Sequence, residues 1–99
     1  MAQNNIQIPT ERLAEFCRRN RIARLSLFGS VLRDDFHDGS DVDMLVEFEP
    51  DAQVGLAICR MERELAEMLG RKVDLRTPAE LSRYFRQHVL DEAEAVYVH

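Results

Sequence analysis

Residues 22–50 read IARLSLFGSVLRDDFHDGSDVDMLVEFEP, two apolar runs separated by a polar segment. The first run, residues 22–29, is short and stopped by glycine, which predicts a strand. Residues 30–35 have the composition of one or two helical turns, and residues 36–40 that of a loop. Residues 41–50 alternate, with Val42, Met44, Val46 and Phe48 on one face, and Pro50 ends the pattern. The stretch therefore predicts two strands joined by a short helical connection.

The flanking sequence adds helices on both sides of this pair. Residues 10–20 predict a helix, and the apolar period of residues 54–69 predicts another, closed by Gly70. Residues 71–77 predict a third strand, and Thr77-Pro78-Ala79-Glu80 is a capping box that predicts a last helix, with Leu81 and Phe85 on its buried face. Residues 95–98 predict a closing strand.

This alternation predicts one α/β (α+β) domain over residues 10–99, a small sheet flanked by helices, preceded by a flexible N-terminal arm at residues 1–9. The order of elements alone leaves open whether the sheet is parallel or mixed.

The composition is that of an ordinary globular protein, with 45% hydrophobic and 31% charged residues among 99. Apolar stretches fall far short of the roughly 20 residues that span a bilayer, and the N-terminus lacks the pattern of a secretory signal. We therefore expect a cytoplasmic protein without a membrane partner. A net charge of −5 disfavours nucleic acid as the main partner, because neutralising phosphates needs clustered Lys and Arg.

Candidate functional residues fall where these elements meet. Gly29-Ser30 lies where the first strand turns into a helical segment, so backbone N–H groups can approach a phosphate there. Asp41 and Asp43 lie two apart in a strand, which places both carboxylates on one face, about 6.6–6.8 Å apart along the backbone. From that separation they can bracket two metal ions, and hard oxygen ligands favour magnesium.

Asp74 lies between Val73 and Leu75 in the third predicted strand. An acidic residue flanked in this way needs a partner or a cation. If the second and third strands are neighbours, about 4.8 Å separates them, and Asp74 can join the first two aspartates. A Walker sequence is absent, which excludes a P-loop mechanism.

The segment GSVLRDDFHDGSDVDMLVEF resembles the G-S-x10-D-x-D signature of the DNA polymerase β-like nucleotidyltransferase superfamily. The chain length and the segment VDLRTPAELSRYFRQHVLDEA are similar to those of the minimal nucleotidyltransferase (MNT) family. The resemblance covers roughly residues 22–97. It implies a mixed sheet of the polymerase β-like palm type and transfer of a nucleoside monophosphate from a triphosphate, ATP above all, to a hydroxyl, with release of pyrophosphate.

Carried over by position, Asp41, Asp43 and Asp74 would bind two Mg²⁺ ions, and Asp74 would help to deprotonate the acceptor. Gly29 and Ser30 would hold the terminal phosphates, and Arg33 would contact phosphate.

Minimal family members commonly act as the antitoxin of a type VII-like HEPN/MNT toxin–antitoxin pair. The resemblance thus implies a HEPN-type toxin as the partner, neutralised by adenylylation of a tyrosine. The alternative is a non-catalytic antitoxin that neutralises its partner by binding alone. Arg83 and His88 match the R-x4-H spacing of HEPN ribonucleases themselves, but those are all-helical proteins, and a solvated helix face is the simpler interpretation. His37, beside the predicted site, is interpreted as an exposed loop residue.

Overall fold

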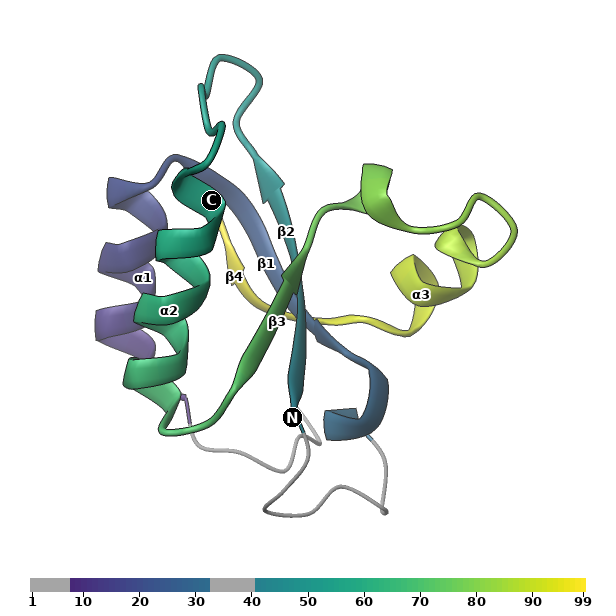
Figure 1. Cartoon of the computed structure of the whole chain (residues 1–99), viewed down its shortest axis with the longest axis horizontal. Coiled ribbons are helices and arrows are strands. Elements are labelled where there is room, and N and C mark those ends of the chain that lie inside the picture. Colours follow the sequence, from purple (N-terminus) through teal and green to yellow (C-terminus); the bar gives the residue numbers. More distant parts are fainter. Residues whose placement is uncertain (1–7, 33–40) are drawn as a thin grey trace.

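The computed structural model describes residues 8–32 and 41–99, which form four strands and the helices around them (Figure 1). The elements in chain order are α1 (Thr10–Arg19), β1 (Ile22–Phe28), the 3-10 helix η1 (Gly29–Leu32), β2 (Val42–Phe48), α2 (Ala57–Leu69), β3 (Val73–Arg76), the 3-10 helix η2 (Pro78–Glu80), α3 (Arg86–Glu92) and β4 (Glu94–Val98). The three strands predicted within residues 22–77 and the closing strand are confirmed, each within a few residues.

The four strands form one mixed sheet in the order β3-β2-β1-β4. β1 pairs antiparallel with both β2 and β4, whereas β2 and β3 are parallel. Parallel neighbours need a long crossover, and α2 supplies it between β2 and β3. The sheet is therefore mixed, which resolves the alternative that the order of elements left open.

One face of the sheet carries the core, and α1 and α2 cover it (Figure 1). Leu13, Phe16 and Cys17 of α1 and Met61 and Leu65 of α2 are all buried there. The alternation in β2 assigned four side chains to this face, and all four pack against these helices. Val42, Met44 and Val46 are fully buried, and Phe48 is partly buried. Ile8, in the predicted arm, also packs against this core, and residues 1–7 lie outside the described part of the chain.

The opposite face carries the side chains that alternate with these core residues along the same strands. The segment that contains η2 and α3 lies on that side of the sheet (Figure 1). Register partners on this face are Ser26 with Leu45, both buried, and Phe28 with Asp43. The sheet thus separates a dry face from one that holds the aspartates.

The prediction of a continuous helix after Thr77 is wrong. The chain makes the short η2 and then leaves the helical conformation at Leu81 (φ −80°, ψ 144°), and α3 begins only at Arg86. The capping box itself forms, since the Thr77 N–H donates to Glu80 Oε1 at 3.0 Å. Phe85, predicted on a buried helix face, is instead 52% exposed.

Within the described residues, none of the helices is both long and apolar enough to cross a membrane.

Candidate active site

The sheet register brings Asp43 and Asp74 side by side. Asp43 of β2 is the register partner of Phe28 on one side and of Asp74 in β3 on the other. Partners in neighbouring strands point to the same face of a sheet, so the two carboxylates emerge together. We expected Asp74 to join the aspartates of the second strand if the second and third strands are neighbours, and in the structure β2 and β3 are paired.

Gly29, directly after β1, lies against the Asp43 side chain. Its φ of +76° falls in the left-handed region, which disfavours every residue with a Cβ. A Cβ built on Gly29 would collide with the Asp43 carboxylate and come within 3.3 Å of Cγ. Glycine is therefore required here for its backbone conformation and also for the space that the carboxylate occupies.

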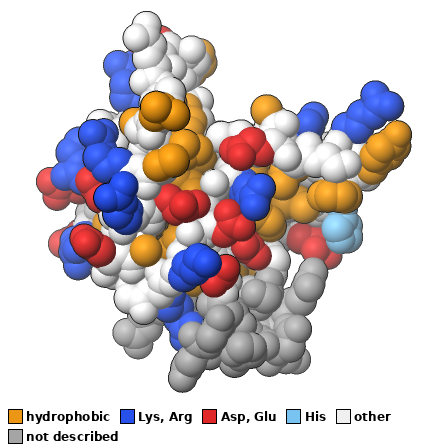
Figure 2. Space-filling view, viewed as in Figure 1, with side chains coloured by type: hydrophobic (Ala, Val, Ile, Leu, Met, Phe, Trp, Pro, Cys, Tyr) orange, Lys and Arg blue, Asp and Glu red, His pale blue; other side chains and the backbone are white. Residues whose placement is uncertain are grey.

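A hollow of about 270 Å³ opens in front of the two carboxylates. Its walls come from the ends of β1, β2 and β3 and from the irregular segment after η2: Phe28, Asp43, Asp74, Arg76, Glu80, Leu81, Ser82 and Phe85. Figure 2 shows acidic and basic side chains intermixed over the middle of this side of the molecule, where β3 runs. The hollow is open and its lining is net negative, with three carboxylates and one guanidinium, so a phosphorylated ligand would need a bound cation there.

Arg76 forms an ion pair with Asp74 at the edge of this hollow. Its Nε lies 3.0 Å from Asp74 Oδ1 and its Nη2 lies 3.2 Å from Oδ2, so the guanidinium engages both carboxylate oxygens. The hydrogen bond and charge of Asp74, followed by the more distant Glu80 and Asp43, raise the pKa of Arg76. Arg76 therefore stays charged and partly neutralises the acidic site.

Asp41 is exposed and directly precedes β2, on the same side of the strand by alternation. Over residues 8–32 and 41–99, no three His, Cys, Asp or Glu side chains lie close enough together to hold a metal ion. The donor chemistry nevertheless suits one, because the paired carboxylates of Asp43 and Asp74 offer hard oxygens of the kind that Mg²⁺ prefers. Binding of Mg²⁺ by all three aspartates stays a prediction.

The predicted phosphate-binding residues fall at the border of the described chain. The backbone of Ser30 belongs to η1, next to Gly29. Arg33 and His37 lie outside the described residues. Phosphate binding by Gly29, Ser30 and Arg33 stays a prediction.

Several residues that line the hollow were missed by the sequence analysis. Arg76 had a usable signal, since it follows Asp74 by two positions in a strand and so must share its face. Phe28 had the corresponding signal from its place at the end of β1. Leu81, Ser82 and Phe85 had none, because the predicted helix hid the turn that brings them to the site.

The R-x4-H spacing has no structural counterpart. Arg83 lies over the ring of its neighbour Tyr84, 5.3 Å from the ring centroid, and His88 Nε2 lies 3.4 Å from Glu92 Oε2. Both are exposed, as the interpretation of a solvated surface requires.

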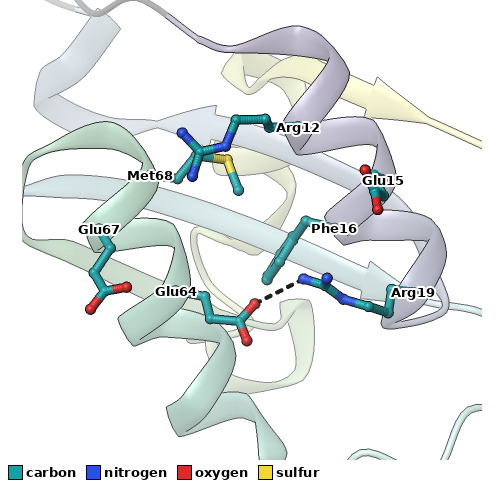
Figure 3. Close-up of a pocket in the computed structure, with 7 residues that line it drawn as sticks. All are labelled: Arg12, Glu15, Phe16, Arg19, Glu64, Glu67 and Met68. Carbon is teal, nitrogen blue, oxygen red and sulfur yellow. Dashed lines mark hydrogen bonds and ion pairs between the residues drawn. The ribbon is translucent and has the colours of Figure 1, made fainter.

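A second, larger hollow of about 360 Å³ lies between α1 and α2, away from the aspartates (Figure 3). The Arg19 guanidinium points across it to Glu64 at 3.2 Å, and Phe16 and Met68 form its apolar floor. Charges of both signs line it, and the Arg19–Glu64 pair joins the two helices.

Comparison with known proteins agrees with this architecture. The family model described as "Nucleotidyltransferase domain" matches residues 10–96. A protein of Methanocaldococcus jannaschii, provisionally named a protein adenylyltransferase, is 32% identical over 90% of this chain and 95% of its own length. The protein adenylyltransferase MntA of Thermococcus cleftensis is 34% identical over 92% of this chain and 89% of its own length.

Solved structures share the fold. A structure provisionally assigned as a minimal nucleotidyltransferase superposes with a TM-score of 0.70 at 34% identity, covering 85% of each chain. A chain in the complex of a tri-AMPylated Shewanella oneidensis HEPN toxin with its MNT antitoxin gives 0.64 at 23% identity, over 91% of this chain and 70% of that one. The second likeness concerns the fold alone.

The family model matches residues 10–96, two relatives exceed 30% identity, and the fold superposes on a minimal nucleotidyltransferase. The chain therefore belongs to the nucleotidyltransferase domain family, among the minimal nucleotidyltransferases that include the protein adenylyltransferase MntA.

Proposed function

We propose that this chain transfers AMP from ATP to a hydroxyl on a HEPN-type toxin and acts as the antitoxin of that pair. The observation that carries the proposal is the pairing of Asp43 and Asp74 on neighbouring strands, above an open hollow, with Gly29 packed against Asp43. In-line transfer at phosphorus needs positioned charge more than it needs a covalent nucleophile, and this arrangement offers positioned carboxylates.

In the proposed reaction the acceptor oxygen attacks the α-phosphorus of ATP. The bond from that phosphorus to the bridging oxygen of the β-phosphate breaks, and pyrophosphate leaves. Asp41 and Asp43 would hold Mg²⁺, and with it the triphosphate. Asp74 would be a further ligand of the cation and would take the proton of the attacking hydroxyl. Bound Mg²⁺ supplies charge neutralisation and a template for the triphosphate.

The choice of a protein acceptor draws support from the relatives. The Thermococcus cleftensis relative is a protein adenylyltransferase, and the Shewanella oneidensis complex pairs an MNT antitoxin with an AMPylated HEPN toxin. The shape of the hollow agrees with a protein acceptor. Phe85, which lines it together with the two aspartates, is exposed, so a side chain of another protein can enter past it.

The test is to incubate the chain with ATP, Mg²⁺ and the product of the neighbouring gene, then measure the intact mass of both proteins. We expect the partner to gain one or more AMP units with the wild type and none with Asp43→Asn, which removes a ligand charge at nearly constant volume. Glu47→Gln is the matched control, since Glu47 lies on the same face of β2 but pairs with Arg24 at 4.0 Å outside the hollow.

A stable complex without any mass gain would contradict transfer and favour the alternative, an antitoxin that acts by binding alone. Undiminished transfer by Asp43→Asn would contradict the assignment of the site.

A further inference from the structure

The carboxylate that the reaction needs is already engaged by a side chain of its own strand. Both oxygens of Asp74 accept a hydrogen bond from Arg76, at 3.0 and 3.2 Å. The pair is half exposed, with 47% of the Arg76 side chain and 38% of the Asp74 side chain accessible. Pairs this exposed are weak, so a ligand with a higher charge can displace them.

A cation bound between Asp43 and Asp74 would meet this guanidinium directly. A carboxylate has about four lone-pair positions, and the two bonds from Arg76 use one on each oxygen. Arg76 and Asp43 also line the same hollow, so a cation held between the two aspartates would lie near the guanidinium. A divalent cation would bind the remaining lone pairs of the same oxygens beside the guanidinium, and because like charges this close repel, the cation would displace Arg76.

A neighbouring hollow offers Arg76 another position. This neighbouring hollow, about 240 Å³, is lined by Asp74 and Arg76 and also by Glu62 and Glu80. Both carboxylates are held in place by backbone N–H groups, Glu62 Oε2 by Leu75 at 2.8 Å and Glu80 Oε1 by Thr77 at 3.0 Å. If the Arg76 guanidinium were displaced from Asp74, it could thus pair with the carboxylates of Glu62 and Glu80.

We propose that Arg76 is a positioning residue that holds Asp74 when the cation is absent and turns toward Glu62 and Glu80 when the cation binds. This rests on the proposed function, since the cation is the one that the transfer uses. Arg76 then sets how much divalent cation the protein needs, because each binding event must first break the Arg76–Asp74 pair.

The first test measures Mn²⁺ binding by calorimetry without nucleotide or acceptor. We expect Arg76→Gln to bind Mn²⁺ more tightly than the wild type, by up to about five-fold, the limit for a half-exposed pair. Arg76→Lys keeps the charge but cannot form the two-bond fork, so its affinity should fall between the two. Arg18→Gln, a charge removal on exposed α1 across the sheet, should leave the affinity unchanged.

The second test follows the movement itself. Cys59 is exposed and lines the neighbouring hollow of about 240 Å³, whereas Cys17 is buried, so a small trifluoroethyl label can be placed on Cys59 alone. Addition of Mg²⁺ should shift the ¹⁹F resonance in the wild type and not in Arg76→Gln.

Equal Mn²⁺ affinities of Arg76→Lys and the wild type would overturn the proposal, and so would the absence of Mn²⁺ binding in both the wild type and Arg76→Gln. A third contrary result is a raised KM for ATP in Arg76→Gln with an unchanged Mn²⁺ affinity. The last would make Arg76 a direct phosphate ligand. A wild type that binds Mn²⁺ but modifies no partner would instead refute the proposed function and leave the comparison of affinities standing.

Discussion

Replacement of Gly29 by alanine tests the close approach between the end of β1 and the Asp43 carboxylate. The substitution has two separable costs, one from the backbone and one from the new Cβ. Gly70, the residue that caps α2, offers a matched control, since its φ of +67° is close to the +76° of Gly29 and a Cβ there would meet nothing within 4 Å.

The backbone cost is the same at both positions. A residue with a Cβ in the left-handed region loses about 1–2 kcal/mol, and the smaller conformational freedom of unfolded alanine returns about 0.4–1 kcal/mol. Gly70→Ala should therefore lower the free energy of unfolding by about 0–1.6 kcal/mol. Gly29→Ala adds a steric conflict with Asp43, and overpacking of this kind costs a further 1–3 kcal/mol or so.

Urea denaturation gives both free energies, and the intact-mass assay gives the effect on transfer. We expect Gly70→Ala to retain transfer. Gly29→Ala should lose about 10²-fold, because the Cβ must push the Asp43 carboxylate out of place and small misplacements cost about that much. Combining Gly29→Ala with Asp43→Ala should recover most of the additional stability loss, since only the Asp43 Cβ, at 3.4 Å, would remain in contact.

Equal stability losses for the two glycine substitutions, together with undiminished transfer by Gly29→Ala, would refute the reasoning. So would a double variant whose stability loss is the simple sum of the single ones, because independent sites add and residues in contact do not.

Two further predictions concern side chains outside the aspartate pair. Burial raises the pKa of the Cys17 thiol to about 12, so at pH 8 a disulfide reagent should label only the exposed Cys59 in the native protein and both thiols in denaturant. Rapid labelling of both thiols in the native protein would contradict the burial of Cys17. Tyr84, 84% exposed beside Phe85 of the hollow, should contact the protein acceptor, so Tyr84→Ala should raise the KM for the acceptor several-fold without changing the KM for ATP. Leu56→Ala, at a side chain 90% exposed and outside the hollow, should change neither constant, and equal effects of the two substitutions would refute the assignment.

The strands were predictable because their signals are local. The alternation in residues 42–48 determined which side chains of β2 face the core, and the same alternation determined that Asp43 faces away from it. The sequence did not show whether β2 and β3 pair, because the pairing of strands far apart in the chain depends on the whole sheet. Once that neighbourhood is given, Asp74 next to Asp43 follows.

The segment after Thr77 was not predictable in the same way. A capping box specifies where a helix begins and contains no information about its length. Here the chain departs from the helix at Leu81, and Phe85 becomes part of the site instead of the core. The Arg76–Asp74 pair was within reach of sequence reasoning, since only its spacing of two residues was needed.

The two faces of β2 have a consequence for how substitutions in this protein combine. Val42 and Met44 contribute to the core while Asp43, between them, faces the hollow. Asp43 and Asp74, far apart in the chain, are coupled through one hollow. Core residues of α1 and α2 lie on the other face of the sheet, so substitutions there and substitutions that line the hollow should combine additively where they are more than about 7–10 Å apart. Substitutions at Val42 and Met44, the direct neighbours of Asp43, should not.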